Sequence, residues 1–299
     1  MHNYPIFNQI QIQILKNKKN KMEHDYCFVT AFYDIGRKNW EHYKRSEDEY
    51  LSFFYNLIQM NIPLVVFIDQ KYCEKVKSAC LELRPANVYT KIIPINDSFL
   101  RENIKSWSYI ERERNIMNSE LYKRVISHRK SCPETHVPEY TCINHAKIDF
   151  VKYAIENIVY GDDIKYVGWV DFGYIRKLND MPSDKVFVYD ALKNNHVNMI
   201  FNNDIDEFDS DPYFTLIFAP EKITGPFWFG SKEALLKYWE KYHATVQKLH
   251  NIGVADDDQA IMLNAFTHQT DNVIKIWKNI LLYTHGWFVG FLLFRNASE

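Results

Sequence analysis

Three aspartates stand directly after short apolar stretches of the sequence, at Asp34, Asp69 and Asp171. Each stretch is typical of a buried strand, so each acid marks the carboxyl end of a strand. Ligands of open α/β sheets bind at that end, which makes the three carboxylates candidates for a binding site. Asp171 is the most informative of them, because aromatic residues flank it and Gly173 follows closely.

A carboxylate at Asp171 can hold a divalent cation, Mn²⁺ or Mg²⁺, that bridges the diphosphate of a nucleotide sugar. Such hard cations take oxygen ligands, and they neutralise a nucleoside diphosphate that leaves as a glycosidic bond breaks. The competing interpretation is that Asp171 only caps a turn. The residue pattern alone does not separate the two.

Residues 225–231 combine glycines with aromatic rings and are predicted to form a loop before a helix. In this loop Trp228 and Phe229 offer apolar ring faces to a sugar, and Gly230 allows close approach of the backbone. The alternative is a packed loop whose rings fill the core.

Three consecutive acids, Asp256, Asp257 and Asp258, stand at the start of an apolar helical stretch. Capping and the helix dipole favour acids there, but three exceed what one cap requires. Asp257 and Asp258 are therefore candidates for a general base on an acceptor hydroxyl, or for stabilising an oxocarbenium-like centre.

Histidines and cysteines gather between residues 128 and 145, without a C-x2-C pair or a standard zinc-finger spacing. A surface loop around Pro133 and Pro138 is the favoured interpretation over a structural zinc site. His145 and Lys147, at the start of a predicted helix, are instead candidates for contact with a diphosphate. The gathered residues are His128, Cys132, His136, Cys142 and His145.

The composition, 46% hydrophobic and 25% charged residues among 299, fits one large α/β domain with a sizeable core. A formal net charge of −2 argues against a chain-wide footprint for nucleic acid, so no nucleic-acid partner is expected. Five cysteines without framework spacing indicate a reducing compartment.

The N-terminal residues lack the order of a secretory signal, because the lysines from residue 16 to 21 follow the apolar residues. The most apolar stretch, residues 287–294, is far shorter than the roughly 20 residues of a spanning helix. We expect a cytoplasmic protein whose contact with the inner face of a membrane is at most peripheral. Residues 1–24 are interpreted as an appendage and linker, and residues 25–295 as one domain.

The elements that must position these residues alternate between strand and helix, which predicts a mostly parallel sheet with covered faces. Ser46 and Glu49 have the spacing of a capping box for one of the helices. Residues 98–130 are charged and helical in pattern, and are predicted to be an insertion or lid. Strands are predicted at residues 26–33, 64–68, 88–93, 164–170, 186–189, 197–201, 213–218 and 273–277, and helices at 46–60, 72–83, 145–159, 232–249 and from 257.

Taken in order, five segments resemble the HtrL/YibB family, proteins associated with bacterial surface polysaccharide loci and related to GT-A glycosyltransferases. Residues 28–37 are the most specific of the five, because a strand followed by Asp-Ile-Gly-Arg is unusual. The other segments are residues 147–150, 169–174, 227–233 and 257–259, so the resemblance covers about residues 26–290.

The resemblance implies a GT-A-like, Rossmann-like fold, with a mixed, mostly parallel sheet flanked by helices and a helical insertion in a single domain. It also implies that Asp171 is the metal-binding acid. GT-A enzymes commonly carry Asp-x-Asp here, whereas this chain has Asp171-Phe172-Gly173. Either a distant ligand such as the late histidine His285 completes the cation site, or the site binds metal weakly. Many relatives have Asp-Glu where this chain has Asp257-Asp258, so Asp258 reaches less far. The predicted donor-binding residues are Thr30, Tyr33, Asp34, Arg37, Lys147, Asp171, Gly173, Trp228, Phe229 and Gly230.

The sequence thus favours transfer of a sugar from a nucleotide-diphosphate sugar to a glycan or lipid-linked glycan acceptor, in surface polysaccharide synthesis. The missing second acid favours the alternative, a non-catalytic protein that binds carbohydrate or nucleotide sugar on the same fold. A nucleotidyltransferase is the weaker third option, since the chain has no Gly-rich P-loop.

Overall fold

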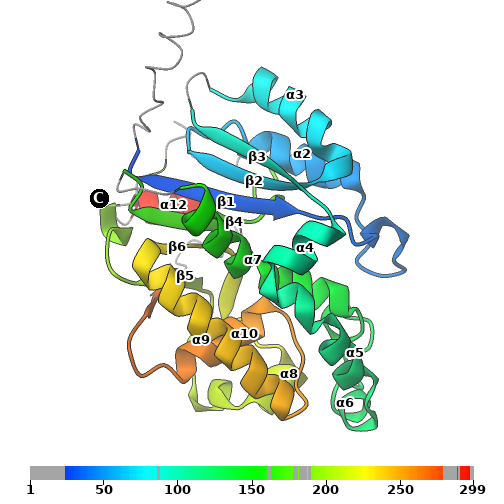
Figure 1. Ribbon diagram of the computed structural model, residues 1–299. Coiled ribbons are helices and arrows are strands. Elements are labelled where there is room, and N and C mark those ends of the chain that lie inside the picture. The colour runs from blue at the N-terminus through cyan, green and yellow to red at the C-terminus, as the bar shows by residue number, and fades with distance from the viewer. Residues whose placement is uncertain are drawn as a thin grey trace, which may run out of the picture.

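The computed structural model describes residues 24–85, 88–159, 163–177, 181, 187, 190–278, 288 and 290–296. A seven-stranded sheet runs through this part of the chain in the order β3-β2-β1-β4-β6-β5-β7 (Figure 1). Neighbouring strands are parallel, except for the two pairs that β6 makes with β4 and β5. The strands are β1 (Tyr26–Phe32), β2 (Leu64–Asp69), β3 (Thr90–Ile95), β4 (Tyr166–Val170), β5 (Val197–Phe201), β6 (Ile223–Ser231) and β7 (Ile274–Lys278).

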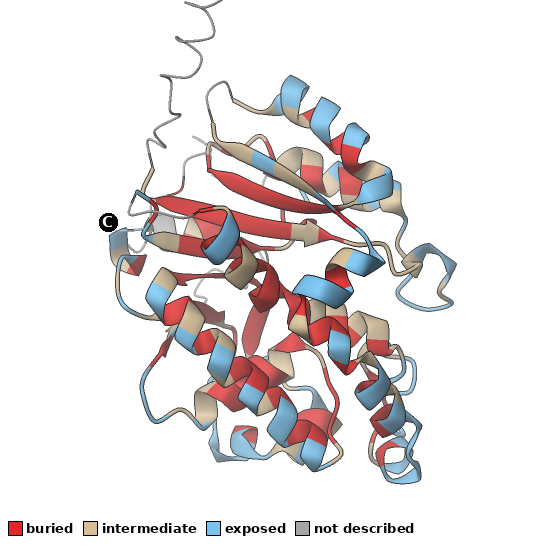
Figure 2. Ribbon diagram, viewed as in Figure 1, coloured by how far each residue is buried: buried red, intermediate tan, exposed pale blue. Residues whose placement is uncertain are grey.

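Helices cover both faces of this sheet, because successive side chains along a strand point to opposite faces. On one face Phe28 packs in a cluster with Phe54 of α2 (Glu47–Leu57) and residues of α3 (Cys73–Leu83) and α12 (Gly290–Asn296). On the other face Val29 packs with residues of α7 (Pro138–Asn157), α9 (Lys232–Asn251) and α10 (Asp258–Thr267). The inner strands are buried along most of their length, while exposed residues lie on the outer sides of the helices (Figure 2). The predicted mixed, mostly parallel sheet flanked by helices is confirmed.

Most predicted elements are present, and their boundaries follow from local chemistry. The Ser46 side chain accepts a hydrogen bond from the Glu49 amide at 3.2 Å and caps α2, as the capping-box spacing predicted. Strand β3 begins two residues later than predicted, at Thr90. Helix α7 begins at Pro138, seven residues before its predicted start, since proline fits the first turn of a helix.

Two predicted elements are wrong. Residues 213–218 belong to helix α8 (Pro212–Phe218), because Asp211 accepts a hydrogen bond from the Tyr213 amide and caps the helix ahead of Pro212. Residues 225–231 form strand β6 rather than a loop. A Cβ on Gly230 would come within 2.7 Å of the His196 carbonyl oxygen, so this glycine lets two strands approach and makes no turn.

The predicted helical insertion is helical, with α4 (Asp97–Asn103), a 3₁₀ segment at Lys105–Tyr109, α5 (Ile110–Asn118) and α6 (Glu120–Val125). Two buried carboxylates fasten it to the core. Glu113 of α5 lies 3.2 Å from His145 of α7 and 3.3 Å from His250 of α9. Asp149 of α7 accepts hydrogen bonds from the Ser106 amide and from His243 of α9, both at 2.8 Å. Its role as a lid stays a prediction.

The predicted N-terminal appendage up to residue 23, most of the strand predicted at 186–189, and His285 lie outside the described residues. None of the helices in the described ranges has the length and apolar character needed to cross a membrane.

Candidate active site at the strand ends

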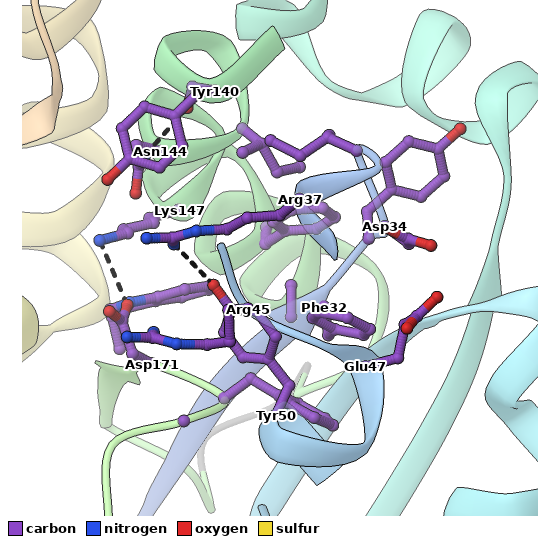
Figure 3. A pocket seen from close by; sticks show the side chains of 18 of the residues that line it. Phe32, Asp34, Arg37, Arg45, Glu47, Tyr50, Tyr140, Asn144, Lys147 and Asp171 are labelled. Atoms are coloured by element: carbon purple, nitrogen blue, oxygen red, sulfur yellow. Dashed lines mark hydrogen bonds and ion pairs between the residues drawn. The ribbon is translucent and has the colours of Figure 1, made fainter. Parts of the chain in front are cut away.

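A cavity of about 330 Å³ opens where β1 and β4 end, between the start of α2 and the middle of α7 (Figure 3). Its walls come from residues 31–37, 45–50, 140–150 and 169–176. Strands β1 and β4 are parallel neighbours, so their carboxyl ends meet at one edge of the sheet. This is the edge at which α/β sheets bind their ligands, as predicted from Asp34 and Asp171.

A chain of three charges connects this cavity to the second half of the fold. The Lys147 ammonium lies 3.2 Å from Asp171 Oδ1 and 2.8 Å from Asp258 Oδ2. Burial alone would lower the pKa of Lys147, but the carboxylates of Asp171 and Asp258 outweigh it and raise that pKa. Two acids from different parts of the sequence therefore hold Lys147 between them and favour its charged form.

Asp171 is fixed at the start of the turn after β4. Its amide donates to the Pro226 carbonyl at 2.9 Å, and its Oδ1 also accepts from the Trp169 indole at 2.7 Å. Its side chain is 35% exposed, so the carboxylate still faces the cavity. Asp171 is thus both an anchored turn residue and an accessible acid, and the two interpretations of the sequence do not exclude each other.

Arg37 owes its position to the Asp-Ile-Gly-Arg turn. The Gly36 amide donates to Asp34 Oδ1 at 2.8 Å, and Gly36 has a φ of 79°, which favours glycine. Arg37 then donates through Nε to the Tyr43 carbonyl at 2.7 Å. Through Nη1 it donates to the Tyr50 hydroxyl at 2.8 Å (Figure 3). The turn therefore aims a guanidinium into the cavity.

Two further guanidinium groups, those of Arg45 and Arg176, line the same cavity. Arg176 lies over the rings of Phe53 and Phe288, at 4.6 and 4.7 Å, and its buried Nε has no hydrogen-bond partner. Burial, followed by the positive charge of Arg45, lowers the pKa of Arg176. Among the ion pairs of the described residues, none joins a carboxylate to Arg37 or Arg176, so the cavity holds donors suited to an anion such as phosphate.

The other acids of this cavity are engaged by surface lysines. Asp34 lies 2.5 Å from the Lys71 ammonium, and Glu47 lies 2.6 Å from that of Lys38. The hydrogen bond from Lys38 lowers the pKa of Glu47 to about 2. Asp34 thus holds its loop, and its predicted contact with a donor stays a prediction.

The remaining predicted donor residues divide into two groups. Tyr33 and Gly173 line the cavity with Asp34, Arg37, Lys147 and Asp171. Thr30 does not, because it lies two residues before the end of β1 and is fully buried. The aromatic segment is likewise absent from the cavity wall, since β6 is a central strand whose side chains fill the core on both faces. Its three predicted residues, Trp228, Phe229 and Gly230, are all buried.

The three consecutive acids have separate surroundings. Asp256 lies 3.4 Å from Arg129, and burial nevertheless raises the pKa of Asp256 to about 6. Asp257 caps α10 by accepting from the Gln259 amide at 3.1 Å. Burial, followed by the charges of Asp258 and Asp256, raises the pKa of Asp257 well above its ordinary value. Asp258 alone of the three reaches Lys147.

Sequence reasoning missed Arg45, Tyr50, Tyr140, Asn144 and Arg176, all of which line the cavity. Arg176 had a usable signal, because it follows Asp171 by five residues in the same strand-end segment. Tyr140 and Asn144 had no such signal, because both precede residue 145, where the sequence predicts the helix to start, and α7 begins at Pro138.

Among the described residues, the cation predicted at Asp171 has the Asp171 carboxylate as its candidate ligand. No group of three or more His, Cys, Asp or Glu side chains within the described ranges can hold a metal ion, and Asp171 Oδ1 is already shared by Trp169 and Lys147. The contact predicted between His145 and a diphosphate is wrong: His145 is 1% exposed and faces Glu113 and Tyr242. A cation held by Asp171 and His285 stays a prediction.

The fold and the site define an α/β protein with a cationic cavity at the strand ends. The chain belongs to the HtrL_YibB family, described as bacterial proteins of unknown function, whose model matches residues 24–296. It is 25% identical over 290 residues to Protein HtrL of Escherichia coli (strain K12), covering 93% of this chain and 95% of that protein. Among solved structures it is similar to core-mannan synthase A (CmsA/Ktr4) from Aspergillus fumigatus in its Mn/GDP form. That similarity has a TM-score of 0.47 and 11% identity, and covers 85% of this chain and 73% of the other.

Proposed function

We propose that this protein is a glycosyltransferase that moves a sugar from a nucleotide-diphosphate sugar to a glycan or lipid-linked glycan acceptor, in surface polysaccharide synthesis. The observation that carries the proposal is the cavity at the strand ends, where Arg37, Arg45, Arg176 and Lys147 surround the accessible carboxylate of Asp171. Its cytoplasmic location stays a prediction.

The guanidinium groups of Arg37 and Arg176 suit the diphosphate of the donor, because they have donors to spare and no carboxylate partner among the described residues. Guanidinium binds phosphate oxygens in pairs and stabilises the negative charge that develops as the nucleoside diphosphate leaves. Tyr33 and Tyr50, which line the same cavity as Arg37, offer ring faces to the nucleotide.

In the transfer step an acceptor hydroxyl oxygen bonds to the anomeric carbon of the donor sugar. The bond from that carbon to the diphosphate oxygen breaks, and its electron pair leaves with the nucleoside diphosphate. The hydroxyl proton passes to a carboxylate, for which we propose Asp257, because Asp258 is already paired with Lys147 whereas Asp257 accepts from the Gln259 amide. Asp258 is held by Lys147 and positions the charges between donor and acceptor.

The assignment of Asp171 is tested with a panel of nucleotide sugars, by measuring release of nucleoside diphosphate. We expect Asp171→Asn to lower the rate of this release by about 100-fold or more, while its far-ultraviolet circular dichroism spectrum stays that of the wild type. Asp271→Asn is the matched control, because Asp271 is half exposed and pairs with Lys241 away from the cavity. Full activity in Asp171→Asn would show that the site lies elsewhere.

One observation favours a second candidate function, a non-catalytic protein that binds nucleotide sugars. Gly173 stands where a second acid is expected, so Asp171 acts without the usual partner. Calorimetric titration separates the two functions: a binding protein takes up the donor without releasing its diphosphate, whereas a glycosyltransferase releases it.

A further inference from the structure

A second cavity, of about 450 Å³, adjoins the one at the strand ends. The two cavities share Arg37 and Tyr140 as lining residues. The second is bounded by Tyr43, by residues 128–134 after α6, and by residues 217–221 at the end of α8. None of these bounding segments was assigned a role from the sequence.

Two large aromatic side chains on the wall of this cavity are exposed. Tyr43 is 54% exposed and Phe218 is 64% exposed. Exposed rings on a hollowed surface are a common sign of binding, and their apolar faces suit the C–H faces of sugar rings. The cavity thus offers two largely exposed rings, of which Phe218 also packs against Phe214 with ring centroids 4.7 Å apart.

Fixed polar groups line the same cavity. Arg129 is buried and is held by the Leu216 carbonyl, by Glu134 at 2.9 Å and by Asp256 at 3.4 Å. Arg129 and Glu134 both line the cavity, so it presents a guanidinium and a carboxylate in preset positions. Such a mixture of charged planar groups and ring faces matches the hydroxyl groups and apolar faces of a saccharide.

The backbone around the cavity is strained. Three described residues other than glycine have positive φ angles, and two of them, Tyr43 at 55° and Ala219 at 42°, line this cavity. Residues held in this region cost free energy and gather at binding sites. The strain supports a shape that is maintained for a ligand.

One guanidinium connects the two cavities, because Arg37 donates to the Tyr43 carbonyl on one side and to the Tyr50 hydroxyl on the other. Burial, followed by the charge of Asp257, raises the pKa of Tyr140, a residue that lines both cavities. A transferase needs two substrates in adjoining sites. We infer that the second cavity binds the saccharide acceptor, an inference that rests on the proposed glycosyltransferase function.

In the test, labelled protein is applied to an array that carries immobilised oligosaccharides without a lipid and immobilised glycolipids. We expect the wild type to bind a subset of them, and Phe218→Ala and Tyr43→Asn to bind the same subset about tenfold more weakly. Asparagine replaces Tyr43 because it tolerates a positive φ. Leu81→Ala is the matched control, since Leu81 is 88% exposed on α3, remote from the cavity. Binding to glycolipids alone would identify a lipid-linked acceptor. Binding to both glycolipids and oligosaccharides would identify a glycan acceptor.

A wild type that binds no saccharide on the array would overturn the inference, as would Phe218→Ala binding like the wild type. The proposed function is assessed separately, by the rise in melting temperature with UDP, GDP, ADP, CDP or dTDP. We expect Phe218→Ala and Leu81→Ala to keep that rise. If no nucleotide raises the melting temperature of the wild type, the proposed glycosyltransferase function is itself contradicted, together with the acceptor site that rests on it.

Discussion

The Lys147 ammonium lies between the carboxylates of Asp171 and Asp258. The ammonium is 10% exposed and Asp258 is 6% exposed, so their attraction is weakly screened by solvent. Removing one partner from such a pair leaves the other buried and uncompensated, which costs much more than breaking a surface ion pair. Lys147 is therefore expected to matter for stability as well as for binding.

We predict that Lys147→Met loses about 3 kcal/mol of unfolding free energy at neutral pH, because Asp258 is left without its cation. Urea titration followed by circular dichroism measures the loss. Lys147→Arg is the control that keeps the charge, and it should lose less. Equal stability of Lys147→Met and wild type would contradict the ion-pair geometry.

Fixed cations in the cavity also bear on the predicted metal. Since Arg37, Arg45, Arg176 and Lys147 already surround Asp171, we predict that nucleoside diphosphate binding persists in EDTA. Calorimetric titration with and without manganese checks this. Binding that requires manganese, and that is lost in His285→Ala, would instead support the predicted Asp171–His285 site.

At the scale of elements, β6 brings α10 to the cavity. A Cβ on Gly225 would lie 2.4 Å from Asp258 Oδ2, so only glycine lets the start of α10 approach the strand. We predict that Gly225→Ala lowers the free energy of unfolding by about 1–3 kcal/mol and slows the release of nucleoside diphosphate from the donor. The sign of the change in unfolding free energy is informative. Where no clash occurs, replacing glycine by alanine stabilises a protein, because it reduces the conformational entropy of the unfolded chain. A stability gain in thermal denaturation would refute the close approach.

Helices α5, α7 and α9 are joined by Glu113 and two histidines. Burial works to raise the pKa of Glu113, but the hydrogen bonds from His145 and His250 prevail and lower that pKa from 4.5 to about 2. A carboxyl whose folded pKa is depressed stabilises the fold above its unfolded pKa. That stabilisation is lost as pH falls from about 4.5 toward about 2.

We therefore predict that Glu113→Gln is less stable than wild type at pH 7 and that the difference shrinks as pH falls to about 2. Unfolding free energies measured across this pH range give the result. Glu233→Gln, on exposed α9 surface, serves as the control because Glu233 pairs only with Lys237 at the surface. A pH-independent difference would mean that Glu113 does not carry the charge.

At the scale of the whole molecule, one hydrophobic cluster joins the two halves of the chain. Val29 and Phe67 from the first half pack in the same cluster as Val246 and Ile274 from the second. Residues 25–295 were predicted to be one domain, and a shared core makes cooperative unfolding the expected behaviour. We predict one calorimetric transition whose midpoint rises with bound nucleoside diphosphate. Two separate transitions would contradict a single domain.

The sequence by itself determined the elements around the cavity, because strand alternation, the Ser46 cap and the Asp-Ile-Gly-Arg turn are local patterns. It also singled out Asp171 and Lys147, whose neighbours in the chain mark a strand end or a helix, while the family resemblance added Arg37. It misplaced the aromatic segment, since the same run of glycines and rings suits a loop or a buried strand.

Only the tertiary structure decided which residues meet. The pairing of Lys147 with Asp258 spans 111 positions and depends on the close approach of β6 and α10. The entry of Arg45 and Arg176 into one cavity depends on how α2 and the turn after β4 pack. Such contacts are set by the packing of distant elements, and no local spacing records them.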